Sequence, residues 1–295
     1  MFATVSSAVV EGVTGRPVAV EVHVSQGLPG YTLVGLPDVS CRESRDRVRA
    51  AILSCGLTWP SRRVTINLAP SGVRKQGSAL DLAIALGILA ASGQLPEGSL
   101  RELGAVGELG LDGSVRSVAG LVCLAGAVCA PTVVVPAAGA VDATVVRPDA
   151  IRGAASLLDV VLAIRGDGPA LAAPEPPAVD DESHSAGDLA DVRGQALARW
   201  ALEVSAAGGH HLLLIGPPGA GKTMLAERLV GVLPTLDAEQ ALVTTQVHSA
   251  AGIALPPGGV VRRPPLRAPH HGASLVSLIG GGTAAMRPGE ISCAN

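Results

Sequence analysis

The order of apolar and polar residues predicts alternating strands and helices in the first half of the chain. In residues 17–24, valine occupies every second position, which is typical of a strand with one buried face. Residues 40–54 have the period of an amphipathic helix, with Ser40 and Glu43 at the spacing of a capping box. The face of this helix that we expect to be buried comprises Val48, Ala51, Ile52 and Cys55.

Three further apolar segments extend this pattern. Residues 64–68 and 133–135 are expected to be strands, and residues 79–92 a mostly apolar helix. The longest uncharged run, residues 118–141, is broken by glycines and prolines, so a buried helix followed by a buried strand explains it better than a membrane span. The first half is therefore expected to be an α+β domain.

Residues 166–187 have the composition of a linker, because they contain little that could be buried. Prolines and acidic residues are frequent there, notably Pro169, Pro174, Pro176, Pro177, Asp180, Asp181 and Glu182. Beyond the linker, residues 194–207 are expected to be a helix, 211–215 a short buried strand and 222–233 a second helix. With a glycine-rich loop before the second helix, this order is the opening of an α/β nucleotide-binding fold.

The loop at residues 216–223 matches G-x-x-x-x-G-K-[ST], in which glycines let backbone N–H groups wrap the β-phosphate of a nucleotide. The following helix points its positive N-terminus at the same anion. Lys222 is expected to reach the β- and γ-phosphates, and the Thr223 hydroxyl to ligate Mg²⁺. The loop residues expected to bind ATP are therefore Gly216, Pro217, Pro218, Gly219, Ala220, Gly221, Lys222, Thr223 and Met224.

Composition narrows the class of protein. Of 295 residues, 48% are hydrophobic and 16% charged, and the net charge of −3 excludes a strongly basic tail that binds nucleic acid. Aromatic residues make up 1%, so platforms that stack bases are not expected. Five cysteines form no C-x-x-C pair and no Lys or Arg precedes the N-terminal apolar stretch, so we expect a cytoplasmic protein without a signal peptide. Only Lys75 and Lys222 are lysines, so each is unusual in an arginine-rich chain.

Short motifs follow one another along both halves of the chain. In the second half they are DVRGQ at 191–195, GGH at 208–210, RAPHH at 267–271, GGG at 280–282 and PGEIS at 288–292. In the first half they are LVGLPD at 33–38, ESR and RVRA between 43 and 50, NLAP at 67–70, and GEL and LDG between 107 and 113. In this order they resemble the YifB/ComM family of magnesium-chelatase-like AAA+ ATPases.

The resemblance implies a protein that uses ATP and Mg²⁺, assembles as a homo-oligomeric ring (a hexamer in this family), contacts DNA and has no membrane partner. Val192, Gly194 and Gln195 fall where AAA+ proteins hold adenine. Family members continue through an apolar strand to the acidic Walker-B residues, whereas this sequence departs from them at residues 293–295. We therefore expect an incomplete α/β P-loop domain with an exposed sheet edge, in which ATP is bound but not hydrolysed, and assign no catalytic residue.

Residues 1–165 resemble the proteolytic domain of the Lon protease, so the expected organisation is this domain, the linker 166–187 and the AAA+ part 188–295. The activity of Lon depends on a Ser–Lys dyad. Alignment places Ala79 at the serine, with Ser78 one residue earlier, and places the lysine near Val122. Lys75 is the only lysine of the domain, and arginine cannot act as a base, so an interaction or oligomerisation role is expected in place of peptidase activity.

Three functions remain open. The first is an ATP-driven motor, a helicase that acts on branched DNA during recombination of incoming DNA. The second is metal insertion into a porphyrin, as in magnesium chelatase. Against it stands the expectation that the resemblance to the chelatase subunit begins only at the ATPase domain. The third is an inactive fragment that retains at most affinity for nucleotide.

Several histidines and charged residues have simpler interpretations. His270 and His271, together with His248, are candidates for a metal site, but adjacent side chains of an extended segment point to opposite faces, which favours loop histidines that bond the backbone. A contact with DNA phosphates and an ordinary solvated loop are equally compatible with Arg262, Arg263 and Arg267. Asp81 is expected to be a paired structural carboxylate, and a solvated helix face is expected to carry Arg42, Arg45, Arg47 and Arg49.

Overall fold

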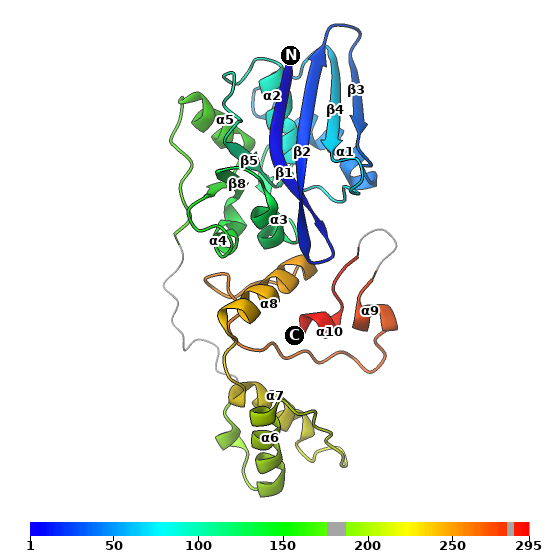
Figure 1. The fold of residues 1–295 in the computed structure, drawn as a ribbon, viewed down its shortest axis with the longest axis vertical. Coiled ribbons are helices and arrows are strands. Elements are labelled where there is room, and N and C mark those ends of the chain that lie inside the picture. The colour runs from blue at the N-terminus through cyan, green and yellow to red at the C-terminus, as the bar shows by residue number, and fades with distance from the viewer. Residues whose placement is uncertain (176–186, 282–285, 295) are drawn as a thin grey trace.

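The computed structural model describes residues 1–175, 187–281 and 286–294 (Figure 1). Several residues named above lie outside these ranges: Pro176, Pro177, Asp180, Asp181, Glu182, Gly282 and Asn295. Within the described residues, every named strand belongs to the first half of the chain, and the second half consists of helices and irregular segments. No helix in the described part of the chain combines the length and hydropathy that crossing a membrane requires.

The described part of the first half is built around one sheet of seven strands. They are β1 (Phe2–Glu11), β2 (Thr14–Ser25), β3 (Gly30–Val34), β4 (Arg63–Ala69), β5 (Leu103–Ala105), β8 (Thr132–Pro136) and β9 (Ile151–Ala154). Their order is β3-β4-β2-β1-β5-β8-β9. β2 is antiparallel to β1 and β4, and the other four neighbouring pairs are parallel. A small hairpin, β6 (Glu108–Leu109) with β7 (Val115–Arg116), stands beside the sheet.

Helices cover both faces of this sheet. They are α1 (Val39–Ser54), α2 (Asp81–Ala91), α3 (Leu121–Ala127), α4 (Ala140–Thr144) and α5 (Leu157–Arg165). Because side chains alternate along a strand, Val5 and Val9 of β1 face the core formed with α1, α2 and α5, whereas Ala8 faces the core formed with α3 and α4. The chain is therefore a mixed α/β protein with a mostly parallel sheet.

The elements that the sequence predicted in the first half are present, with one correction at α1, whereas β1, β3, β5, β9 and α5 were not predicted. The valines at 18, 20, 22 and 24 are buried on β2, as the alternation predicts. Val48, Ala51 and Ile52 are buried on α1, and Cys55 is half-buried. The expected cap Ser40 was wrong, because the helix already begins at Val39 and the Asp38 carboxylate accepts the Cys41 N–H at 2.7 Å.

The second half contains α6 (Ala196–Gly208) and α7 (Lys222–Val232), which confirms the two helices expected around the glycine-rich loop. The expected strand at 211–215 was wrong. No described segment pairs with it, and Leu213 and Ile215 are 80% and 86% exposed. An apolar run becomes a strand only when a neighbour satisfies its backbone groups, and periodicity cannot supply that neighbour.

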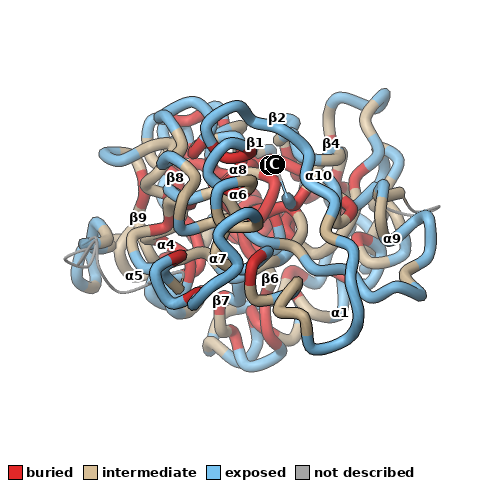
Figure 2. The backbone as a smooth tube through the Cα atoms, turned by 90° about the horizontal axis from the view of Figure 1, so that it is seen from below, coloured by how far each residue is buried: buried red, intermediate tan, exposed pale blue. Residues whose placement is uncertain are grey.

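Three further α-helices follow α7 within the described ranges of the chain. α8 (Ala238–Ala251) lies between α3 and α7 in Figure 1. α10 (Glu290–Cys293) packs against α8, whereas α9 (Leu275–Ile279) contains no buried residue (Figure 2). A small separate core, formed by Leu189, Val192, Leu202 and Leu225, holds α6 and α7 together.

Candidate functional site

The glycine-rich loop, residues 216–221, has at two positions a backbone conformation that only glycine adopts freely. Gly219 has φ of +82° and Gly221 φ of +77°, both in the left-handed region that costs other residues free energy. Gly221 is also the N-cap of α7, so the chain turns directly from the loop into the helix. The glycines of the motif therefore have a local conformational cause at these two positions.

Lys222 folds back over this loop. Its ammonium donates to the carbonyl oxygens of Gly216 at 2.9 Å and Pro217 at 2.8 Å. The side chain remains partly accessible to solvent. The positive charge therefore lies on the loop itself, and its contact with the phosphates of a nucleotide stays a prediction.

The first turn of α7 adds backbone donors beside the lysine. The first amides of a helix have no acceptor within it, and the bond from Leu225 N–H to the Gly221 carbonyl, at 3.0 Å, is the first of the helical series. Thr223 is exposed and Met224 half-buried, whereas Leu225 is buried in the small core. One side of α7 is thus anchored, while its N-terminus and the Thr223 hydroxyl are open to an anion and its metal ion.

The residues expected at the adenine lie against the same loop. Gln195 donates its side-chain amide to the Ala220 carbonyl at 3.3 Å. Gly194 has φ of +70° and Gln195 φ of +48°, so two successive residues take the left-handed backbone at the start of α6. Val192 is buried in the small core together with Leu225 of α7. The structure brings these residues and the loop together, and their role in binding stays a prediction.

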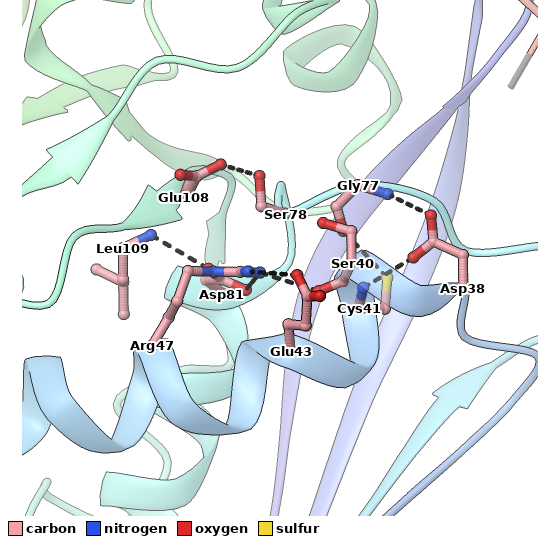
Figure 3. Close-up of polar contacts among 10 residues, drawn as sticks. All are labelled: Asp38, Ser40, Cys41, Glu43, Arg47, Gly77, Ser78, Asp81, Glu108 and Leu109. Carbon is pink, nitrogen blue, oxygen red and sulfur yellow. Dashed lines mark hydrogen bonds and ion pairs between the residues drawn. The ribbon is translucent and has the colours of Figure 1, made fainter. Parts of the chain in front are cut away.

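A second polar cluster lies in the first half of the chain, where α1, α2 and β6 meet (Figure 3). Asp81, at the start of α2, is 1% exposed and accepts from Arg47 Nε at 2.6 Å and Nη2 at 3.1 Å. Arg47 also donates to the Ser40 carbonyl at 3.0 Å, and the Leu109 N–H donates to Asp81 at 3.4 Å. The Asp81 carboxylate therefore joins three elements that are distant in the sequence.

Asp38 extends this cluster to the loop before α2. Its carboxylate accepts from the N–H groups of Cys41 at 2.7 Å and Gly77 at 3.1 Å (Figure 3). The Cys41 thiol lies within hydrogen-bond distance of the carbonyls of Lys75, at 3.4 Å, and Gly77, at 3.1 Å. Burial raises the pKa of the Cys41 thiol to about 12, so it is a neutral donor here and no nucleophile.

Sequence reasoning identified only part of this cluster. Asp81 is paired, as expected, but Arg47 is not on a solvated face: its side chain is 19% exposed because the start of α2 packs over it. Asp38 and Glu108 were missed, although each lies in a motif of the first half, LVGLPD and GEL. Periodicity places a residue on a helix face but does not say which element covers that face.

Known proteins match both halves of the chain. A family model described as "Magnesium chelatase, subunit ChlI" matches residues 188–295, and one described as "Subunit ChlI of Mg-chelatase" matches residues 20–138. An uncharacterised protein of Mycobacterium tuberculosis is 45% identical over 292 residues, which are 98% of this chain. YifB of Escherichia coli is 45% identical, and the competence protein ComM of Haemophilus influenzae 42%, each over 96% of this chain.

The chain belongs to the YifB/ComM family of magnesium-chelatase-like proteins. It spans 58% of the length of the mycobacterial relative and 56% of the other two. The match at residues 20–138 corrects one expectation, because likeness to a model named for the chelatase subunit is not confined to the ATPase part. The expectation that the resemblance begins only at the ATPase domain therefore no longer argues against metal insertion.

Near the position of the Lon nucleophile, this YifB/ComM-family chain has side chains that are engaged elsewhere. The Ser78 hydroxyl donates to a carboxylate oxygen of Glu108. The Lys75 side chain is buried, and its ammonium donates to the Pro70 carbonyl. Burial lowers the pKa of the Lys75 ammonium. The lack of peptidase activity stays a prediction, and these contacts are compatible with it.

The histidines of the second half follow the sequence interpretation only in part: His270 bonds the backbone as expected, its Nδ1 accepting the Gly272 N–H at 3.1 Å. The ring centroids of His270 and His271 are 4.0 Å apart, because the two residues lie at a turn and not in an extended segment. No group of three metal-binding side chains exists among the described residues, and His248 bonds the Cys293 carbonyl at 2.9 Å. Arg267 forms a double contact with the Glu290 carboxylate at 2.7 and 2.9 Å, whereas Arg262 and Arg263 are exposed.

Asp81 predicts a pH dependence of stability. Burial raises the pKa of its carboxyl from 3.8 to about 6, although Arg47 acts in the opposite direction. The folded state therefore binds this proton more tightly than the unfolded state, so the free energy of unfolding should fall as the pH rises from about 4 to about 6. The slope from this group approaches about 1.4 kcal/mol per pH unit. Urea unfolding across this range should show the slope, and Asp81→Asn should remove it; an unchanged slope in the variant would contradict this assignment.

Proposed function

We propose that this chain is the nucleotide-binding part of an ATP-driven motor that acts on DNA. The observation that carries the ATP half is the phosphate loop, with left-handed glycines at 219 and 221 and the Lys222 ammonium seated on two loop carbonyls. Thr223 would ligate the Mg²⁺ that accompanies the nucleotide, and residues 192–195 would contact the adenine. Bound Mg²⁺ neutralises phosphate charge.

The DNA half of the proposal is supported by the relationship to a competence protein and by exposed arginines. Because Arg267 is paired with Glu290, contacts with DNA phosphates are assigned to Arg262 and Arg263. The proposed substrate is branched DNA formed during recombination of incoming DNA. We further propose a hexameric homo-oligomer in the cytoplasm, where the five free cysteines would stay reduced.

Changing Arg262 and Arg263 together to glutamine should weaken binding of branched DNA to residues 1–295, and to a similar extent for every base sequence. The slope of log affinity against log salt should become shallower by about 1.8, since each phosphate contact contributes about 0.9. Fluorescence anisotropy of a labelled junction at several salt concentrations measures both effects. Arg16→Gln, in an exposed pair with Glu11, is the matched control. Equal affinity and slope in the double variant and the parent would contradict the contact.

A second candidate is metal insertion into a porphyrin, because both matching family models carry the name of a magnesium chelatase subunit. Thermodynamic linkage separates the two candidates, since a substrate coupled to ATP must change the affinity for ATP, and ATP must change its own affinity equally. Titration of an ATP analogue in the presence of branched DNA, and then of a porphyrin, identifies the ligand that is coupled. Coupling to the porphyrin alone would replace the motor proposal.

Residues 1–295 should bind ATP without turning it over. Hydrolysis needs a carboxylate that holds Mg²⁺ or orients water at the γ-phosphate. The acidic residues after Thr223 cap or flank α8 or pair with arginines, namely Glu227, Asp237, Glu239 and Glu290. Phosphate release should therefore equal the background rate, with and without DNA. Turnover that disappears in Lys222→Ala would contradict this prediction.

We also propose the domain boundaries 1–165, 166–187 and 188–295, and a Lon-like fold without peptidase activity for the first domain. The sheet of the described first half and the separate small core around α6 and α7 support two units. In this proposal the first domain serves as an interaction element within the protein.

A further inference from the structure

The N-terminal domain is in contact with α8, the helix that follows α7 in the chain. α8 begins at Ala238, six positions after α7 ends at Val232, yet it packs against α3 of the first domain. In the last turns of α8, the buried residues include Thr245, Val247, His248, Ser249 and Ala250. In Figure 1, α8 lies between α3 and α7. It is therefore placed to connect the nucleotide site with the first domain.

Ser249 of α8 completes the N-terminus of α3. Gly120, the N-cap of α3, brings no side chain that could cap the helix. The Ser249 carbonyl accepts the Gly120 N–H at 2.7 Å, and the Ser249 hydroxyl accepts the Val122 N–H at 3.2 Å. Ser249, which belongs to the second half of the chain, thus accepts hydrogen bonds from two amides at the start of a helix in the first domain.

Cys123 adds a contact one residue further along α3. Its thiol lies 3.2 Å from the Val13 carbonyl in the β1–β2 turn and 3.4 Å from the Gln246 carbonyl of α8. On the sheet side of α3, Gly15 of β2 leaves no room for a Cβ, which would collide with the Cys123 backbone. Because these elements are closely packed, a shift of α8 would also displace α3 and the β1–β2 hairpin.

The segment between α7 and α8 is itself fixed by hydrogen bonds. The Leu236 N–H donates to the Arg262 carbonyl at 2.9 Å, and Asp237 caps α8. The Val261 N–H donates to Thr245 Oγ1 of α8, also at 2.9 Å. Because the connection between α7 and α8 is short and hydrogen-bonded, a change in the position or motion of α7 is transmitted to α8.

We propose that α8 transmits the nucleotide state of the phosphate loop to the N-terminal domain through Ser249 at the start of α3. The inference rests on the proposed nucleotide binding and gives the first domain a role as the element that responds to it. Nucleotide that fixes α7 reduces the motion of α8, so α3 loses its cap less often. Ser249 is a positioning residue in this coupling, since it touches no nucleotide.

Hydrogen exchange at the Val122 amide, in the 295-residue chain, tests the proposal. A saturating non-hydrolysable ATP analogue with Mg²⁺ should slow this exchange at least about threefold in the parent. Ser249→Ala should bind the analogue with parental affinity, exchange about fivefold faster without it, since a lost cap typically has an effect of this size, and no longer respond to it. Ser249→Thr, which keeps the hydroxyl, should restore the response, and Ser277→Ala on exposed α9 should leave it unchanged.

A fluorescent ATP analogue titrated into the same samples separates the outcomes. If the analogue binds the parent and Val122 exchange does not change, the coupling is wrong and the proposed nucleotide binding stands. If Ser249→Ala still responds like the parent, the route through Ser249 is wrong. If the analogue does not bind at all, the proposed function and this inference fall together.

Discussion

Lys222→Ala is expected to weaken ATP binding to residues 1–295 at least about 100-fold, which corresponds to about 2.7 kcal/mol. The lysine is the only side-chain cation of the loop, and its ammonium is already seated on the carbonyls of Gly216 and Pro217. Hydrogen bonds between such a cation and phosphate oxygens are roughly twice as strong as neutral ones. Titration of a fluorescent ATP analogue measures the effect, and an unchanged affinity would mean that nucleotide binds elsewhere.

Two matched variants separate charge from shape and from the metal ion. Lys222→Arg keeps the charge but replaces a compact ammonium with a planar fork, so it should also bind more weakly than the parent. Thr223→Ala should retain Mg²⁺-free binding and lose the gain in affinity that Mg²⁺ gives the parent. If Mg²⁺ strengthens binding equally in Thr223→Ala, the metal assignment is wrong.

The two lysines allow a chemical test of the same site. Lys75 is 0% exposed, so acetylation of the folded chain should modify Lys222 and the N-terminal amine and spare Lys75. ATP should slow the reaction at Lys222 without slowing it at the N-terminal amine, which lies on the first domain beside Val24. Mass spectrometry of peptides reads each position, and a reaction at Lys222 that ATP leaves unchanged would count against the site.

Asp81→Ala is expected to lower the free energy of unfolding of the N-terminal domain by about 3 kcal/mol, the cost of leaving a largely buried charge without its partner. Arg47 would lose both contacts with the carboxylate, and the Leu109 N–H would lose its acceptor. Urea unfolding followed by Trp59 fluorescence measures the change, because Trp59 packs against the core of this domain. A Trp200→Phe background removes the signal of the other tryptophan, which is 61% exposed.

The matched controls distinguish a broken ion pair from a general effect of losing a carboxylate. Glu11→Ala breaks an exposed pair with Arg16 and should cost less than about 1 kcal/mol. Changing Asp81 to leucine and Arg47 to methionine together should recover much of the loss, since apolar side chains can replace a buried pair. A loss under about 1 kcal/mol in Asp81→Ala would show that the pair is screened by water and does not hold the domain together.

The elements that sequence predicted correctly share one property, which is that their cause is local. The valine alternation of β2 and the apolar face of α1 follow from the geometry of a strand and a helix, and α2 from a continuous apolar run. Segment 211–215 has the composition of a strand and forms none, because its cause would be a neighbouring strand. The cap of α1 is Asp38 and not Ser40, and the same carboxylate also accepts the Gly77 N–H of another loop, a contact that no local pattern predicts.

The features of the candidate site can also be divided into those with a local cause and those that depend on distant segments. The motif determined the local conformation of the glycine-rich loop, since eight consecutive residues carry both the glycine conformations and the lysine. Sequence alone did not reveal that the rings of His270 and His271 lie against each other, or that Arg267 is paired with Glu290. Each of these depends on a turn or on a second segment that packing brings near.

By itself, the sequence determined the periodic elements, the conformation of the glycine-rich loop and the membership of a family, because each is encoded in short stretches of residues. Only the tertiary structure decided that Arg47 pairs with Asp81, 34 residues away, and that Ser249 caps a helix at Val122, 127 residues away. Which polar groups lose water, and which partners they then find, depends on how distant elements pack. The energetics of Asp81 and the coupling through α8 therefore follow from the fold and from no local pattern.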